Sequence, residues 1–209
     1  MFDSALLLSL YLYLERIMRR ERVRHMKIVI GITGASGSIY ALRLIDVLRK
    51  LGHEVHGVVT DSGWQVLAYE CNISREELTQ RVDVLYDNAN IGAAIASGSF
   101  KADAMVVLPC SMKTAACIAH SLSDNLLTRA ADVMLKEGRP LVLVPREAPM
   151  HAIHLENLLT LAKLGVKIVP AAPGFYHRPR TIDDLVNMLV GKICDQLGID
   201  ADLFPRWEG

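Results

Sequence analysis

The fold of this chain is decided by Met26-Lys-Ile-Val-Ile-Gly-Ile-Thr-Gly-Ala-Ser-Gly-Ser38. This stretch predicts a short apolar strand, a glycine-rich turn and the start of a helix. Glycines let the backbone come close to a bound group, and the free N–H groups at a helix N-terminus favour an anion. We therefore expect a site for the phosphate of a nucleotide or flavin.

The glycine turn does not have the G-x-G-x-x-G spacing of a dinucleotide fingerprint. The next predicted strand leads to Thr60-Asp61-Ser62, where a hydroxyl comes before the acidic residue. Asp61 leaves a nicotinamide cofactor open as an alternative, and a turn that only packs a helix on a strand is the simplest alternative.

Apolar runs alternate with helical patterns along the rest of the chain. The predicted strands are Ile28–Ile32, Val55–Val59, Met105–Leu108, Leu141–Val144 and Val166–Val169. Nearly continuous apolar runs are typical of parallel strands that are covered on both faces. The pattern predicts an α/β fold: a single Rossmann-like (flavodoxin-like) domain with a doubly wound parallel sheet and helices on both faces.

Helix signals lie between these strands. Ile39, Leu42, Ile45 and Leu48 recur at helical spacing. Ser123 is the predicted cap of a helix that runs to Gly138. Two further helices are expected, one from about His151 to Leu164 and one from Thr181 through Leu197.

Composition excludes several classes of function. The chain has 209 residues, of which 51% are hydrophobic, and 23 basic residues balance 23 acidic ones. This balance gives no basic field for nucleic acid. Cys71, Cys110, Cys117 and Cys194 show no zinc spacing, so we expect free thiols in a reducing cytoplasm.

Residues 1–25 differ from the rest of the chain. The apolar run Ala5–Leu14 is too short to span a bilayer, and the arginines follow it rather than precede it, unlike in a signal peptide. We expect no membrane span. The interpretation is a dispensable leader or an upstream start codon over residues 1–25, followed by one domain over residues 26–209.

Unusual residues gather in the loops that follow the predicted strands, where ligands of parallel sheets bind. Ser111 and Thr114 are three residues apart at a strand-to-helix turn, so both hydroxyls can face one phosphate, although ordinary capping explains them equally well. Arg146 can grip a phosphate or a flavin carbonyl through two N–H bonds. The proline-rich loop Pro170–Pro179 carries the aromatic hydroxyl of Tyr176.

A metal site is not expected. His151 and His154 lie three residues apart near Glu156, but three spaced ligands on one helix face are not evident.

Several strings of sequence together resemble the UbiX-type flavin prenyltransferases, a family also called phenylacrylic acid or 3-octaprenyl-4-hydroxybenzoate carboxy-lyases. The strings are Thr33-Gly-Ala-Ser-Gly37, Ala96-Ser-Gly-Ser99, Pro109-Cys-Ser111, Asn125-Leu-Leu-Thr-Arg-Ala-Ala-Asp132, Arg139-Pro-Leu-Val-Leu-Val-Pro-Arg-Glu-Ala-Pro149, His154-Leu-Glu-Asn157, Pro170-Ala-Ala-Pro-Gly-Phe-Tyr-His177 and Pro205-Arg-Trp207. The resemblance covers Lys27 to Trp207.

The resemblance implies a metal-independent transfer of the dimethylallyl group of dimethylallyl monophosphate to N5 and C6 of reduced FMN. The product, prenylated FMN, would be the cofactor of a partner UbiD-type decarboxylase. The family's assembly implies a homododecamer in which neighbouring subunits complete each site.

The resemblance also assigns roles to individual residues. Seven residues would bind FMN: Gly34, Ala35, Ser36, Thr60, Ser111, Thr114 and Arg146. Five would surround dimethylallyl monophosphate: Lys136, Arg146, Tyr176, Lys192 and Trp207. Ser36 and Glu70 would serve proton movement near flavin N5, and Glu147 would assist them.

Two positions depart from the family pattern. Lys192 stands where we expect arginine, and it keeps the charge but loses the bidentate fork. Ile91 stands where relatives can have a tryptophan, so shielding of an allylic cation would rest on the flavin, Trp207 and either Tyr69 or Trp64.

Two other functions remain open on the sequence. One is a flavin-dependent decarboxylase of the peptidyl-cysteine type, whose relatives use a histidine near the first helix; here that helix offers Ser36, Ser38 and Tyr40. The other is a non-catalytic carrier of FMN or prenylated FMN.

Overall fold

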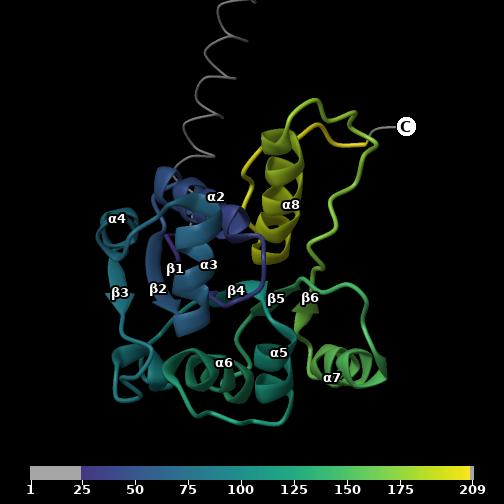
Figure 1. Ribbon diagram of the computed structural model, residues 1–209. Coiled ribbons are helices and arrows are strands. Elements are labelled where there is room, and N and C mark those ends of the chain that lie inside the picture. Colours follow the sequence, from purple (N-terminus) through teal and green to yellow (C-terminus); the bar gives the residue numbers. More distant parts are fainter. Residues whose placement is uncertain (1–24, 208–209) are drawn as a thin grey trace, which may run out of the picture.

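The computed structural model describes residues 25–207, whose strands pair in the order β3-β2-β1-β4-β5-β6 (Figure 1). All neighbouring strands are parallel. The strands are β1 (Lys27–Ile32), β2 (Glu54–Val59), β3 (Val84–Tyr86), β4 (Ala104–Cys110), β5 (Leu141–Pro145) and β6 (Lys167–Ile168). This order confirms the predicted Rossmann-like sheet. No helix among the described residues is long and apolar enough to cross a membrane.

Helices cover both faces of the sheet, as Figure 1 shows. They are α2 (Ser38–Lys50), α3 (Asp61–Cys71), α4 (Arg75–Arg81), α5 (Met112–Ala119), α6 (Leu126–Lys136), α7 (Ala152–Lys163) and α8 (Ile182–Leu197), with a short 3₁₀ turn η1 (Ala94–Ala96). The residues 1–24 of the predicted leader lie outside the described part of the chain, so the domain boundary at Met26 stays a prediction.

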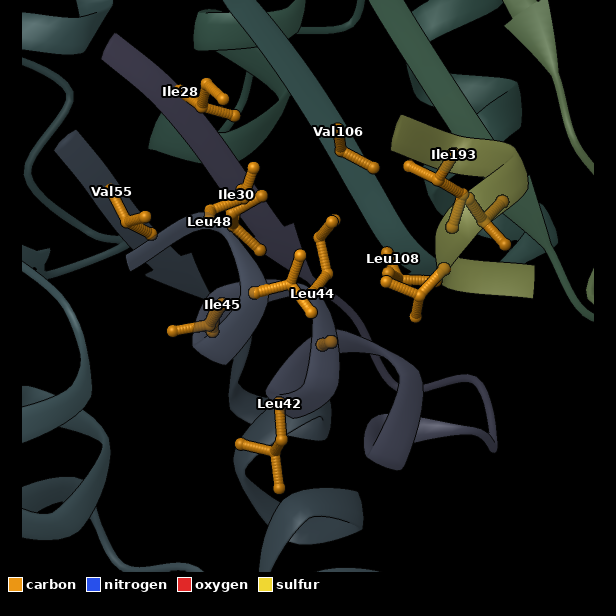
Figure 2. Packing of buried hydrophobic residues seen from close by; sticks show 14 of the residues in the cluster. Ile28, Ile30, Leu42, Leu44, Ile45, Leu48, Val55, Val106, Leu108 and Ile193 are labelled. Carbon is orange, nitrogen blue, oxygen red and sulfur yellow. The ribbon is translucent and has the colours of Figure 1, made fainter. Parts of the chain in front are cut away.

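Two apolar cores lie on opposite faces of the sheet. On one face, Ile28 and Ile30 of β1 pack with Leu44 and Leu48 of α2 and with Ile193 of α8 (Figure 2). The other core joins the opposite side of the strands to α5, α6 and α7. Successive strand residues therefore enter different cores, which explains the nearly continuous apolar runs.

The strand predictions were confirmed except at the two edges of the sheet. β3 was not predicted, because its apolar run is only three residues long and these residues are exposed or half-buried. β6 is shorter than the predicted Val166–Val169 strand. Edge strands carry weak signals because one side of their ladder has no partner strand.

The predicted cap of α6 was wrong. Asn125, not Ser123, is the N-cap, and its side chain accepts a hydrogen bond from the Thr128 N–H at 3.0 Å. Either residue type suits a cap, so only the backbone path decides between them. α3 and α4 were not predicted at all. The helices predicted to end at Leu164 and Leu197 are present as α7 and α8.

The strand order reverses between β1 and β4, so the connections from these two strands leave in opposite directions. In such sheets, the crevice for a ligand lies outside the carboxyl ends of the strands at this switch point. Thr33, just after β1, is hydrogen-bonded to both Pro109 and Ser111 of the β4 end. The loops after β1 and β4 therefore lie side by side.

Candidate functional site

The glycine turn after β1 directs its N–H groups at a carboxylate of this chain. Oε2 of Glu70, near the end of α3, accepts hydrogen bonds from the Gly37 N–H at 2.9 Å and the Ser38 N–H at 3.0 Å. The sequence predicted free N–H groups here, and for these two donors that prediction was wrong. A side-chain anion already complements the N-terminus of α2.

Glu70 is held as a carboxylate. Partial burial works to raise its pKa, but hydrogen bonds from Ser36, Gly37 and Ser38 and the charge of Arg146 outweigh burial. The net effect is a pKa below the ordinary value of a glutamate. The structure thus brings Ser36, Glu70 and Arg146 into one electrostatic group, at the ends of β1, α3 and β5.

The N-terminus of α3 lies against the same turn. Thr60 caps this helix, and its hydroxyl accepts the Gly63 N–H at 3.1 Å and lies 3.3 Å from the Ser62 hydroxyl. A Cβ on Gly34 would come within 2.5 Å of the Ser62 hydroxyl, so only glycine lets the turn touch the start of α3. The predicted flavin residues Gly34 and Thr60 are therefore close together.

Ser111 and Thr114 form the N-terminus of α5. The Ser111 hydroxyl accepts the Thr114 N–H at 3.2 Å and lies 3.0 Å from the Thr114 hydroxyl. The capping alternative is confirmed for Ser111, and the two hydroxyls are adjacent; that both face one phosphate stays a prediction. α3 and α5 thus both have neutral hydroxyl caps. Asp61 adds an acidic side chain to the first turn of α3, whereas the first turn of α5 has none, so the positive end of α5 is the one that no carboxylate complements.

Arg146 and Glu147 follow β5. The Arg146 N–H bonds to the Cys110 carbonyl, and its side chain is exposed. The Glu147 carboxylate accepts the N–H of the next residue, Ala148, at 3.0 Å. Glu147 is thus engaged within its own loop, whereas the Arg146 guanidinium remains exposed toward the site.

Tyr176 belongs to an aromatic cluster between the loop after β6 and the C-terminal segment. Its ring meets that of Trp207 edge to face at 6.0 Å between centroids and that of His177 at 5.7 Å. Figure 1 shows these two segments meeting beside the upper end of α8. Tyr176 and Trp207, both predicted to contact the substrate, are brought together, and both are exposed.

Lys192 lies on α8 beside Asp195, with 3.5 Å between Nζ and the carboxylate. Asp195 also accepts both arms of the Arg206 guanidinium, at 2.6 and 2.8 Å. Lys192 lines a groove of about 520 Å³ between α8, α7 and the edge strand β6, with Met188 and Pro170. If the Lys192 amine moves away to bind a ligand, Arg206 still pairs with the Asp195 carboxylate.

Lys136 is not brought to the other predicted residues within one subunit. It ends α6, just before β5, whereas Arg146 follows the far end of β5. Its amine pairs with Glu137 at 2.7 Å. In sequence, the two cations thus flank opposite ends of β5.

The other sequence candidates have separate surroundings. Trp64 packs against the Arg75 guanidinium, Tyr69 is 92% exposed, and Ile91 is also exposed. The ring centroids of His151 and His154 lie 3.5 Å apart, with the ring planes tilted by 30°. Within residues 25–207, no group of three or more His, Cys, Asp or Glu side chains is placed to hold a metal ion.

The carboxyl edge of the sheet fits FMN. The hydroxyls at the starts of α3 and α5, and the positive end of α5, suit a phosphate. Arg146 can pair with an anion or a ring carbonyl, while Ser36 and Glu70 supply a hydroxyl and a carboxylate for a polar ring edge. Sequence reasoning missed Thr33, Asp195 and Arg206, because no local pattern reveals a contact between distant segments.

Comparisons with known proteins identify the family. The sequence model of the Flavoprotein family matches residues 17–194. The chain is 49% identical over 188 residues to the flavin prenyltransferase UbiX of Halalkalibacterium halodurans, an alignment that covers 85% of this chain and 91% of that protein.

Solved structures give the same family. The crystal structure of AnUbiX (PadA1) in complex with FMN and dimethylallyl pyrophosphate superimposes with a TM-score of 0.87 at 39% identity, covering 89% of this chain and 99% of that one. A dodecameric FMN-dependent UbiX-like decarboxylase from Escherichia coli O157:H7 gives a TM-score of 0.86 at 43% identity, covering 88% and 100%. By its sequence and its fold, the chain belongs to the flavoprotein family and, within it, to the UbiX flavin prenyltransferases.

Proposed function

We propose that this protein joins the dimethylallyl group of dimethylallyl monophosphate to N5 and C6 of reduced FMN, releasing phosphate and prenylated FMN. The observation that carries this proposal is the grouping of Ser36, Glu70 and Arg146 beside the hydroxyl-capped starts of α3 and α5. Reduced FMN would supply the nucleophilic ring atoms.

The flavin would lie across the switch point between β1 and β4. Thr60, Ser111 and Thr114 offer hydroxyls there, and the turn at Gly34, Ala35 and Ser36 brings backbone close to the ligand. Arg146 would neutralise negative charge at the rim. This placement keeps the anion away from Glu70, which occupies the N-terminus of α2.

The allylic phosphate would be held by Tyr176 and Lys192, with Arg146 on the flavin side and Trp207 covering the five-carbon chain. Cations stabilise the charge that builds on a departing phosphate, which is usually the largest catalytic contribution. No metal is needed for this task because the leaving group is a monophosphate within reach of several cations.

Lys136 would come from a neighbouring subunit. Within one subunit, it precedes β5 whereas Arg146 follows this strand. The dodecameric state of the Escherichia coli relative supports a homododecamer here, in which two subunits complete each site.

Proton movement would depend on Ser36 and Glu70. Glu70 is ionised near neutral pH, so it would accept a proton rather than donate one in the resting enzyme. The Ser36 hydroxyl, hydrogen-bonded to Glu70, would carry that proton between the flavin edge and the carboxylate. Glu147 would assist from the loop after β5.

The product would serve a UbiD-type decarboxylase of aromatic acids, which would use prenylated FMN as its cofactor. We place this reaction in the cytoplasm. All four cysteines are free thiols, which suits a reducing compartment. We further propose that residues 26–209 form the functional domain, so a chain that begins at Met26 is expected to keep wild-type turnover.

The test is to mix the full chain anaerobically with excess reduced FMN and dimethylallyl monophosphate, and to measure the mass of the extracted flavin. The enzymatic function is supported if the extracted flavin gains the mass of one dimethylallyl unit and each subunit converts more than one flavin. Such multiple turnover excludes a non-catalytic carrier. No mass gain contradicts the proposal. A parallel reaction with dimethylallyl pyrophosphate, the ligand in the AnUbiX structure, decides between monophosphate and pyrophosphate.

Two variants separate binding from chemistry. Ser36→Ala and Glu70→Ala are each expected to retain FMN but slow formation of the new ring; unchanged turnover would remove that residue from the proton route. A decarboxylase is the second candidate because the Escherichia coli relative is described as one. Release of CO₂ from an aromatic acid by this chain alone, without prenylated FMN, would favour it.

A further inference from the structure

The loop after β1 and the loop after β4 are joined by one buried side chain, Thr33. Only 1% of this residue is exposed. Its hydroxyl donates a hydrogen bond to the Pro109 carbonyl at 2.7 Å and accepts one from the Ser111 N–H at 2.8 Å. Its own N–H also points to the Pro109 carbonyl, at 3.3 Å.

Thr33 takes over where the strand ladder stops. β1 and β4 are paired only as far as Gly31 and Val107, and β4 is irregular between Val107 and Cys110. Pro109 has no N–H to offer the neighbouring strand. The threonine hydroxyl therefore continues the connection between two diverging strands, at the switch point where the ligand crevice opens.

Each loop that Thr33 joins carries a hydroxyl assigned above to the flavin. Ser36 follows it by three residues, and Ser111 is bonded to it through the backbone. A small shift between the two loops would change the distance between these groups, and sites depend on such spacing to within fractions of an ångström.

We propose that Thr33 is a positioning residue that fixes the flavin-binding loops relative to each other and so sets the affinity for FMN. The inference rests on the proposed function. Buried donors are expensive to leave unpaired, so loss of the hydroxyl would let the Ser111 loop move to find another partner. The effect reaches the ligand through the two loops, because the buried side chain itself does not face the site.

The experiment compares Thr33→Val with Thr33→Ser in the full chain. Valine keeps the approximate volume but removes the hydroxyl, and we expect FMN to bind at least about tenfold more weakly. Serine keeps the hydroxyl, and binding is expected to remain within about threefold of wild type. The dissociation constant is measured by quenching of FMN fluorescence, and the visible spectrum of bound FMN reports its surroundings.

Thr128→Val is the matched control. Thr128 is equally buried, but its hydroxyl bonds to Asn125 and Asp124 within the first turn of α6. This variant is expected to lose thermal stability without losing FMN affinity. If Thr33→Val binds FMN as tightly as Thr128→Val does, Thr33 is merely structural and the inference is overturned. If wild type itself does not bind FMN, the proposed function fails instead.

A second measurement needs no variant. The Ser111 N–H, bonded to a buried hydroxyl, is expected to exchange slowly with deuterium in the protein without FMN. Exchange at the rate of an unstructured amide would show that the junction is not formed before the ligand binds, and would overturn the proposal even if Thr33→Val failed to fold.

Discussion

Glu70 lies 33 residues after Gly37 in the chain, yet its carboxylate accepts the N–H groups at the start of α2. A glycine turn before a helix suggests a free anion site, and here a side chain of the protein fills part of it. Because Glu70 occupies those two donors, we expect the proposed flavin phosphate at the hydroxyl-capped starts of α3 and α5. The polar edge of a flavin ring can still approach Ser36 and Glu70.

The depressed pKa of Glu70 predicts how stability responds to acid. A carboxylate whose pKa is lower in the folded state stabilises that state above the ordinary pKa, and the contribution disappears as pH falls through the lowered value. We expect Glu70→Gln to destabilise the protein near neutral pH and to differ less from wild type in strong acid. The measurement is the thermal midpoint at fixed protein concentration from about pH 8 to about pH 3.

Glu156→Gln, on the exposed surface of α7, is the control for loss of one carboxylate. It is expected to follow the wild-type profile. A Glu70→Gln profile parallel to wild type at every pH would contradict the prediction.

Lys192 predicts an effect of side-chain shape on substrate binding. Arginine at this position would present a planar fork to the phosphate, so Lys192→Arg is expected to lower KM for dimethylallyl monophosphate by roughly threefold to tenfold, with kcat changed little. Steady-state kinetics at saturating reduced FMN measure both. Lys50→Arg, at the end of α2, is expected to change neither. An unaltered or raised KM in Lys192→Arg would place the amine away from the phosphate.

At the level of elements, the starts of the helices determine where an anion can bind. α2 begins at a left-handed glycine without a side-chain cap and receives Glu70, whereas Thr60 and Ser111 cap α3 and α5. A hydroxyl cap satisfies one N–H group and adds no full charge. The positive end of α5 therefore remains available to a ligand, whereas α3 also carries Asp61 in its first turn. The difference between the three termini orients the proposed flavin.

The cap of α6 gives a stability prediction. Asn125→Ala removes the acceptor of the Thr128 N–H and is expected to cost about 1 kcal/mol of unfolding free energy. Ser123→Ala is the matched change, because its buried hydroxyl has no hydrogen-bond partner among the described residues; its cost is expected to be much smaller. Urea unfolding at equal subunit concentration compares the two. A larger loss of unfolding free energy in Ser123→Ala than in Asn125→Ala would indicate that Ser123 caps α6.

For the whole molecule, the main consequence is that one subunit cannot gather all the proposed cations. β5 separates Lys136 from Arg146, and strands do not shorten to bring their ends together. Three of the proposed substrate residues lie around the C-terminal segment: Tyr176, Trp207 and Lys192. Arg206 of this segment is hydrogen-bonded to Asp195 of α8. A complete phosphate site therefore calls for a second copy of the chain.

Mixed assemblies test this arrangement. Lys136→Ala and Arg146→Ala subunits are each expected to be nearly inactive alone. When the two are co-expressed, roughly a quarter of the sites in random assemblies combine an intact Arg146 with an intact Lys136 of the partner chain, and activity is expected to return to that extent. Prenylated FMN formed per subunit is the measure, and co-expression of Lys136→Ala with itself is the control. No recovery in mixed assemblies of normal size would place both residues in one subunit.

The sequence by itself determined the parallel sheet, most of its strands, the glycine turn, the pairing of Ser111 with Thr114 and the family. These features are recorded locally, in apolar runs, caps and specific strings that need no distant partner. Only the tertiary structure decided that Glu70 occupies the start of α2, that Thr33 joins two loops, that Asn125 caps α6 and that Lys136 pairs with Glu137 before β5, whereas Arg146 follows this strand. Most of these features depend on how the fold brings together residues that are distant in sequence. The cap of α6 depends on the backbone path, which selects one of two neighbouring side chains. No periodicity in the sequence encodes either the long-range contacts or the backbone path.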